Sequence, residues 1–136
     1  QKRGPLDEQE WSFVRRHTIV GERILSAAPA LADVAALVRS SHENWNGGGY
    51  PDALAGDSIP VGSRIIAVCD AFDAMTSDRP YRVAMPPADA LAELERCAGT
   101  QFDPAVVAAF RSTMSEHSGA HAPQAVRLRP PATSQK

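Results

Sequence analysis

The sequence predicts an all-α domain, a helical bundle of about five to six helices, on three observations. Apolar residues recur at helical spacing along most of the chain. No stretch sustains the apolar–polar alternation that is typical of a half-buried strand. The densest glycine and proline clusters fall between the periodic stretches, where loops are expected.

The first helix is expected to begin after Asp7. Asp7 can accept a hydrogen bond as the N-cap, and Glu10 three residues later completes a capping pattern. Trp11 and Val14 begin the apolar face. We expect this pattern to break near Thr18, so that the helix closes close to residue 17.

A second amphipathic helix enters from Pro29 and is expected to run to about Glu43. The stretch Asn46–Asp52, here called the glycine loop, follows it. Three consecutive glycines and a proline exclude a helix or a strand interior in this loop.

Three further helices are predicted after the glycine loop. The third is strongly apolar and closes near Ser77. The fourth opens at Pro86–Pro87, with Leu91 and Leu94 on one face. In the last, Asp103 is the expected N-cap and Pro104 the first-turn proline.

The chain of 136 residues has material for one domain. We expect that domain to occupy residues 1–114. From Ser115 onward the sequence is rich in Ser, Gly, Ala, His and Pro, so residues 115–136 are expected to form a disordered tail.

Composition excludes several classes of protein. A formal charge of −2 provides no field for nucleic acid or an anionic membrane, and no apolar run is long enough to span a bilayer. Two cysteines are too few for a disulfide scaffold. A cytoplasmic location is the expectation that follows.

Polar groups lie where a plain helical bundle would not place them. His17 is expected at the end of the first helix, His42 and Glu43 at the end of the second, and Asp70 inside the apolar third helix. Imidazoles and carboxylates that converge from separate helices are a usual way to build a metal site in a bundle.

Each of these residues also has a structural explanation. His17 suits the negative end of a helix dipole, and His42 could be a helix cap. Asp70 could pair with Arg64 or with a neighbouring lysine or arginine. Cys69 is expected to be a small buried hydrophobe, and His117 and His121 lie near or in the expected tail, so none of these three is taken as a ligand. The residues alone therefore indicate a helical domain that could hold a metal.

The stretch Ser41–Asp52 closely resembles the signature of HD-GYP domains, a branch of the HD-domain phosphohydrolases. It matches that signature at His42, Glu43, Gly47, Gly49, Tyr50 and Pro51. The resemblance continues in colinear order over about residues 4–111. It includes Arg16-His17 before Gly21, the run from Asp70 to Arg82, and Gly99–Pro104.

The resemblance implies an HD-domain-like fold that holds iron or manganese and hydrolyses a cyclic dinucleotide, typically cyclic di-GMP. By position, His17, His42 and Asp70 would be metal ligands, with no catalytic residue beyond the metal site. Arg79 and Arg82 would bind substrate phosphate. Gly49, Tyr50 and Pro51 would form the loop that the family often uses to contact protein partners.

Two departures from the family pattern bear on activity. Ser41 replaces the first signature histidine, and a hydroxyl is a poor ligand for borderline metals. Asn46 replaces an aspartate, a milder change because both residues suit turns. The family's HD pair is expected upstream of Lys2–Pro5, outside this chain. We therefore expect weak metal binding and impaired activity in this stretch.

The leading functional hypothesis is a metal-dependent cyclic di-GMP phosphodiesterase-type hydrolase. The alternatives are a degenerate, non-catalytic HD-GYP module for protein interaction or signalling, and an enzyme acting on another nucleotide. A homodimer is also expected, through uncovered apolar faces that include Trp11, Val14, Ile66 and Phe72.

Overall fold

The computed structural model describes residues 7–79 and 82–119 of the chain. In this part of the chain every regular element is a helix, so the predicted all-α class is confirmed. Five α-helices and two short 3-10 turns follow one another in the described residues: α1 (Glu8–Ser26), η1 (Pro29–Leu31), α2 (Ala32–Arg39), η2 (Gly56–Ser58), α3 (Val61–Thr76), α4 (Pro87–Arg96) and α5 (Pro104–Gly119).

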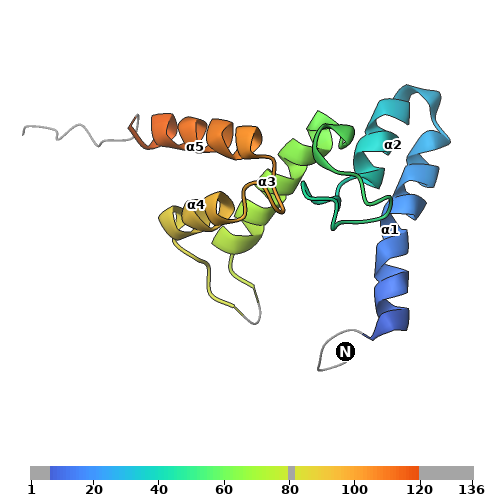
Figure 1. The fold of residues 1–136 in the computed structure, drawn as a ribbon, viewed down its shortest axis with the longest axis horizontal. Coiled ribbons are helices and arrows are strands. Elements are labelled where there is room, and N and C mark those ends of the chain that lie inside the picture. The colour runs from blue at the N-terminus through green and yellow to red at the C-terminus, as the bar shows by residue number, and fades with distance from the viewer. Residues whose placement is uncertain (1–6, 80–81, 120–136) are drawn as a thin grey trace, which may run out of the picture.

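The helices form two packed groups (Figure 1). Helix α1 lies antiparallel against α2 at one end of the molecule, while α4 and α5 lie against α3 at the other end. In the second group Val68, Leu94, Phe102 and Val107 form the buried core. The rings of Phe72 and Phe110 meet edge to face beside this core, with their centroids 5.0 Å apart.

Helix α1 begins as predicted. The Asp7 carboxylate accepts from the Glu10 amide, and the Glu10 carboxylate accepts from the Asp7 amide, which completes a capping box. The expected break near Thr18 is wrong, because α1 continues unbroken to Ser26. The Thr18 side chain is fully buried, and its hydroxyl donates to the Arg15 carbonyl inside the helix.

The close packing of α1 on α2 depends on Gly21. A β-carbon at this position would lie 2.9 Å from a Val38 methyl group. Helix α2 ends at Arg39, so the expectation that it runs to about Glu43 is wrong. Residues 40–42 form a turn instead.

The segment between α2 and α3 joins the two groups of helices. The Trp45 amide donates to the Gln101 carbonyl at 3.1 Å, and the Asn46 amide to the Thr100 carbonyl at 2.9 Å. The Arg64 guanidinium lies over the Trp45 ring, 5.6 Å from its centroid. These contacts fix the glycine loop against the α4–α5 connection.

Helix α5 opens as predicted, with the Asp103 carboxylate accepting from the Ala105 amide. It continues to Gly119, past residue 114 where the domain was expected to end. Most of the expected tail, residues 120–136, lies outside the described residues, so the domain boundary stays a prediction. Within the described ranges, no helix has the length and apolar content to cross a bilayer.

Candidate metal and nucleotide site

His17 projects from the middle of α1 rather than from its end, so its explanation as a helix-end cation is wrong. Its Nδ1 is hydrogen-bonded to the Val14 carbonyl. Because a carbonyl only accepts, Nδ1 carries a proton, and in the neutral imidazole the lone pair is therefore on Nε2. A backbone carbonyl that fixes the tautomer in this way is a common support for a metal-binding histidine.

His42 lies beside His17, although the two come from separate elements. Their ring centroids are 4.9 Å apart at an interplanar angle of 67°. The Tyr50 ring stacks on His42 at 5.1 Å and 20°. Partial burial, and then the neighbouring His17, lower the pKa of His42 below its ordinary value of 6.5, while Asp70 acts in the opposite direction. A neutral imidazole is the form that binds metal.

Glu43 organises the glycine loop instead of facing the histidines. It is 4% exposed, and its two carboxylate oxygens accept from the Asp52 amide at 2.7 Å and the Leu54 amide at 3.0 Å. The Tyr50 amide donates to the His42 carbonyl at 3.1 Å. These bonds hold the Tyr50 ring where it can stack on His42.

A charged group outside the loop also fixes it. The Arg39 guanidinium donates to both Asp52 oxygens, at 2.6 and 2.8 Å, and to the Glu22 carboxylate of α1 at 2.5 Å. This bidentate contact lowers the pKa of the Asp52 carboxyl below its ordinary value of 3.8. The loop is thereby tied to both helices of the first group.

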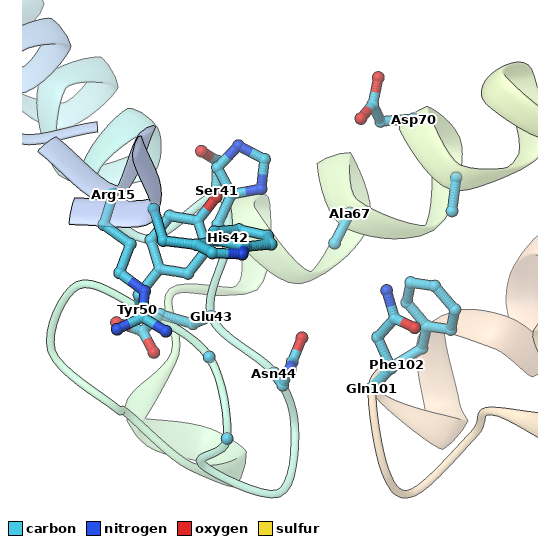
Figure 2. Close-up of a pocket in the computed structure, with 14 residues that line it drawn as sticks. Arg15, Ser41, His42, Glu43, Asn44, Tyr50, Ala67, Asp70, Gln101 and Phe102 are labelled. Carbon is cyan, nitrogen blue, oxygen red and sulfur yellow. The ribbon is translucent and has the colours of Figure 1, made fainter. Parts of the chain in front are cut away.

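A cavity of about 460 Å³ opens between the two groups of helices. His42, Tyr50 and Arg15 lie on one wall, and Asp70 of α3 lies on the other (Figure 2). Phe102 and Gln101, from the α4–α5 connection, line the same cavity. Its volume is in the range of small-molecule sites.

The donor groups fit a metal only in part. Two adjacent imidazoles, at least one with a fixed free lone pair, suit iron or manganese. Among the described residues, however, no three His, Cys, Asp or Glu side chains converge on one metal position. Ser41 adds only a hydroxyl, a poor ligand for borderline metals, and this hydroxyl donates to the Val38 carbonyl at 2.9 Å.

Asp70 is exposed on α3, and Cys69 beside it is also exposed, so the expected burial of Cys69 is wrong. Pairing of Asp70 with Arg64 is wrong as well. The Arg64 guanidinium instead contacts Asp103 at 2.9 Å and Asp57 at 3.1 Å. The Asp70 carboxylate is therefore not engaged by Arg64.

Arg79 and Arg82 do not line the cavity. Their main chains pair with each other just beyond α3, and the Arg82 guanidinium donates to the Ala74 carbonyl at 2.5 Å. The structure therefore does not bring these arginines to the histidine pair. Their expected contact with phosphate stays a prediction.

Sequence reasoning missed Arg15, which lines the cavity next to Tyr50. The available signal was its position in the run Arg15-Arg16-His17, a charged pair directly before a candidate ligand. The role of Glu43 was also missed, since its partners lie nine and eleven residues further along the chain.

Comparison with known proteins places this geometry in a family. The sequence model of a protein family described as "HD domain" matches residues 1–106 of this chain. The chain belongs to the HD domain family. Proteins of this family with phosphodiesterase activity generally depend on divalent metals.

Several curated relatives share this HD domain. The chain is 41% identical over 111 residues to a cyclic di-GMP phosphodiesterase of Thermotoga maritima, which covers 80% of this chain and 30% of that protein. It is 40% identical over 114 residues to the 3'3'-cGAMP-specific phosphodiesterase 3 of Vibrio cholerae, covering 84% and 25%.

A solved structure agrees with these relatives. The crystal structure of a cyclic GMP-AMP-specific phosphodiesterase of Vibrio cholerae matches with a TM-score of 0.56 and 29% identity, over 68% of this chain and 22% of that one. The HD domain chain thus spans less than a third of the length of these proteins.

Proposed function

We propose that this HD domain chain carries part of an HD-GYP-type, metal-dependent phosphodiesterase site whose substrate is a cyclic dinucleotide, cyclic di-GMP in the first instance. The observation that supports the proposal is the imidazole pair of His17 and His42, in which His42 stacks on Tyr50 and both of these residues line a ligand-sized cavity. The names of the relatives, a cyclic di-GMP and a 3'3'-cGAMP phosphodiesterase, supply the substrate class.

In this proposal His17, His42 and Asp70 hold iron or manganese, and Arg79 and Arg82 bind substrate phosphate. A bound divalent metal would polarise the phosphodiester and lower the pKa of a water molecule near it. The residues described here orient the imidazoles: the Val14 carbonyl fixes the tautomer of His17, and Tyr50 fixes the ring plane of His42.

The second candidate is a degenerate HD-GYP module that contacts a protein through Gly49, Tyr50 and Pro51. One observation favours it: Ser41 provides only a hydroxyl, and no third donor joins the histidine pair in the described part of the chain. On either reading we expect weak, substoichiometric manganese or iron and no measurable linearisation of cyclic di-GMP by the chain itself.

Titration of the chain with Mn²⁺, followed by electron paramagnetic resonance, tests the proposal. We expect binding to be lost in His42→Ala and His17→Ala, and kept in Asp89→Asn, which removes a carboxylate from an exposed position that does not line the cavity. Ser41→His should tighten Mn²⁺ binding on the order of tenfold, because it restores an imidazole beside His42.

Binding of Mn²⁺ that is unchanged in His42→Ala would refute the metal site. Two tightly held ions per wild-type chain would show that the ligand set is more complete than proposed. Linearisation of cyclic di-GMP with Mn²⁺ that is gained in Ser41→His would favour the phosphodiesterase over the degenerate module.

A further inference from the structure

Arg15 lines the cavity without an ion pair to any described residue. Arg39 and Arg64 each form two ion pairs, whereas Arg15 forms none with any described residue. Glu43 lines the same cavity, but its carboxylate is engaged by two backbone amides and makes no ion pair with Arg15. A guanidinium at the wall of a cavity is therefore available to an anion.

Aromatic groups flank this free cation. The Arg15 guanidinium lies over the Trp11 ring, 6.0 Å from its centroid. Tyr50 lines the same cavity as Arg15 (Figure 2). The Trp11 side chain is 43% exposed, so part of its surface remains free to contact a ligand.

A second cavity, of about 720 Å³, is lined by residues of α1 and by residues 49–51 of the glycine loop. Trp11, Arg15, Gly49 and Tyr50 line both cavities, so the two cavities meet at these residues. Two adjoining hollows that share an arginine and two aromatic rings suit a ligand with more than one ring and more than one anionic group.

We infer that Trp11, Arg15 and Tyr50 form a nucleotide subsite, in which Arg15 binds a phosphate and Trp11 stacks on the base attached to it. Guanidinium groups bind phosphate through two parallel hydrogen bonds, and a base stacks readily on an exposed tryptophan. The inference rests on the proposed function for the choice of a cyclic dinucleotide as ligand. It adds α1 as a second source of phosphate binding, separate from Arg79 and Arg82.

Calorimetric titration with cyclic di-GMP in EDTA tests the subsite without metal, with GMP and inorganic phosphate as comparison ligands. We expect Arg15→Gln to weaken binding of cyclic di-GMP by about tenfold, or about 1.4 kcal/mol. Arg15→Lys should recover part of the loss, because it keeps the charge without the fork. Trp11→Ala should weaken cyclic di-GMP and GMP while leaving inorganic phosphate unchanged.

The matched control is Arg23→Gln, which removes one positive charge from an exposed position of α1 away from both cavities. Equal weakening by Arg23→Gln and Arg15→Gln would reduce the effect to general electrostatics and overturn the inference. Wild-type affinity in Arg15→Gln, or no binding of any nucleotide by the wild type, would also overturn it.

The two proposals fail separately. If binding of cyclic di-GMP depends on Arg15 but Mn²⁺ binding does not depend on His42, the subsite is supported and the metal site is refuted. Arg15-dependent binding of GMP alone would keep the subsite and exclude the cyclic substrate. Mn²⁺ binding that requires His42, with unchanged affinity for cyclic di-GMP in Arg15→Gln, would keep the metal site and remove the subsite.

Discussion

At Gly49 the backbone passes too close to the preceding turn for any side chain. A β-carbon there would lie 2.3 Å from the Asn44 nitrogen and 2.5 Å from the His42 carbonyl oxygen, and neither backbone atom can move aside alone. The stacking of Tyr50 on His42 depends on this close approach, because Tyr50 follows Gly49 directly.

We expect Gly49→Ala to lower the free energy of unfolding by about 1–3 kcal/mol and to separate the rings of His42 and Tyr50. Urea denaturation measures the first effect, and histidine ring shifts in NMR spectra measure the second. Gly48→Ala is the matched control, since a β-carbon there meets only the Asn46 side chain, at 3.1 Å. Similar losses in both variants would contradict the role of the close approach.

The Arg39–Asp52 pair makes loop stability depend on pH. Since the folded state lowers the pKa of Asp52, the stabilisation is fully present above the ordinary value of 3.8 and is lost as the pH falls through the lower folded value. The difference in unfolding free energy between wild type and Asp52→Asn should therefore shrink below pH 3.8. Denaturation at several pH values measures it.

Asp33→Asn is the control for that series. Asp33 is exposed in the first turn of α2 and forms no ion pair within the described residues. Its substitution should change stability little at any pH. A difference for Asp52→Asn that stays constant down to strongly acidic pH would show that the pair contributes nothing through its charge.

The residues whose roles were predicted correctly from the sequence are those whose hydrogen-bond partners are close in the chain. Asp7 and Glu10 cap α1, and Asp103 caps α5, through neighbours two or three residues away. Glu43 was grouped with the histidines because its partners, the Asp52 and Leu54 amides, exist only once the loop is closed. Such non-local pairing leaves no local pattern to read.

At the scale of elements, Asp103 links the start of α5 to α3. One carboxylate oxygen accepts from the Ala105 amide, and the other contacts the Arg64 guanidinium at 2.9 Å. Asp103 is 5% exposed, so this ion pair is largely removed from water. Arg64 in turn lies over Trp45 at the start of the loop segment.

Two substitutions separate these roles of Asp103. Asp103→Asn keeps an oxygen for the cap but loses the charge that faces Arg64, whereas Asp103→Ala loses both. We expect the alanine variant to cost about 1 kcal/mol more than the asparagine variant, the usual size of an N-cap. Thermal and urea unfolding measure this difference. Equal costs would mean that the cap contributes nothing.

The predictions of helix boundaries from sequence were wrong where tertiary packing decides the boundary. The break expected near Thr18 does not occur, because its side chain is fully buried and its hydroxyl finds an acceptor within the helix. The exposure of Asp70 and Cys69 was missed for a related reason. Helix α3 is apolar on more than one face, and Ile65 and Ile66 remain 46% and 45% exposed.

At the scale of the whole molecule, a large apolar surface is left uncovered in the described residues. Phe13, Val20 and Ile24 follow one stripe of α1 and are 77%, 50% and 69% exposed. Trp11 is also exposed, while Val14 and Phe72 are half-buried. Soluble monomers rarely expose contiguous apolar patches larger than about a few hundred Å².

We therefore expect the chain to form a homodimer at micromolar concentration through the stripe of Phe13, Val20 and Ile24, which leaves Trp11 uncovered. Light scattering after size exclusion should give twice the 14.5 kDa chain mass. Phe13→Glu combined with Ile24→Glu should return the mass to that of one chain, and Glu95→Gln, on the far group of helices, should not. A wild-type monomer with a cooperative thermal transition would contradict the expectation.

The two main-chain hydrogen bonds between the loop segment and the α4–α5 connection also affect the rate of local opening between the two groups of helices. The Trp45 and Asn46 amides are held by carbonyls of another helix group, so neither can exchange with solvent until the two groups separate locally. The cavity wall that carries His42 lies directly next to these amides in the chain. The rate of that local separation therefore limits how often the wall can rearrange around an incoming ligand, and hydrogen exchange at two backbone positions reports it.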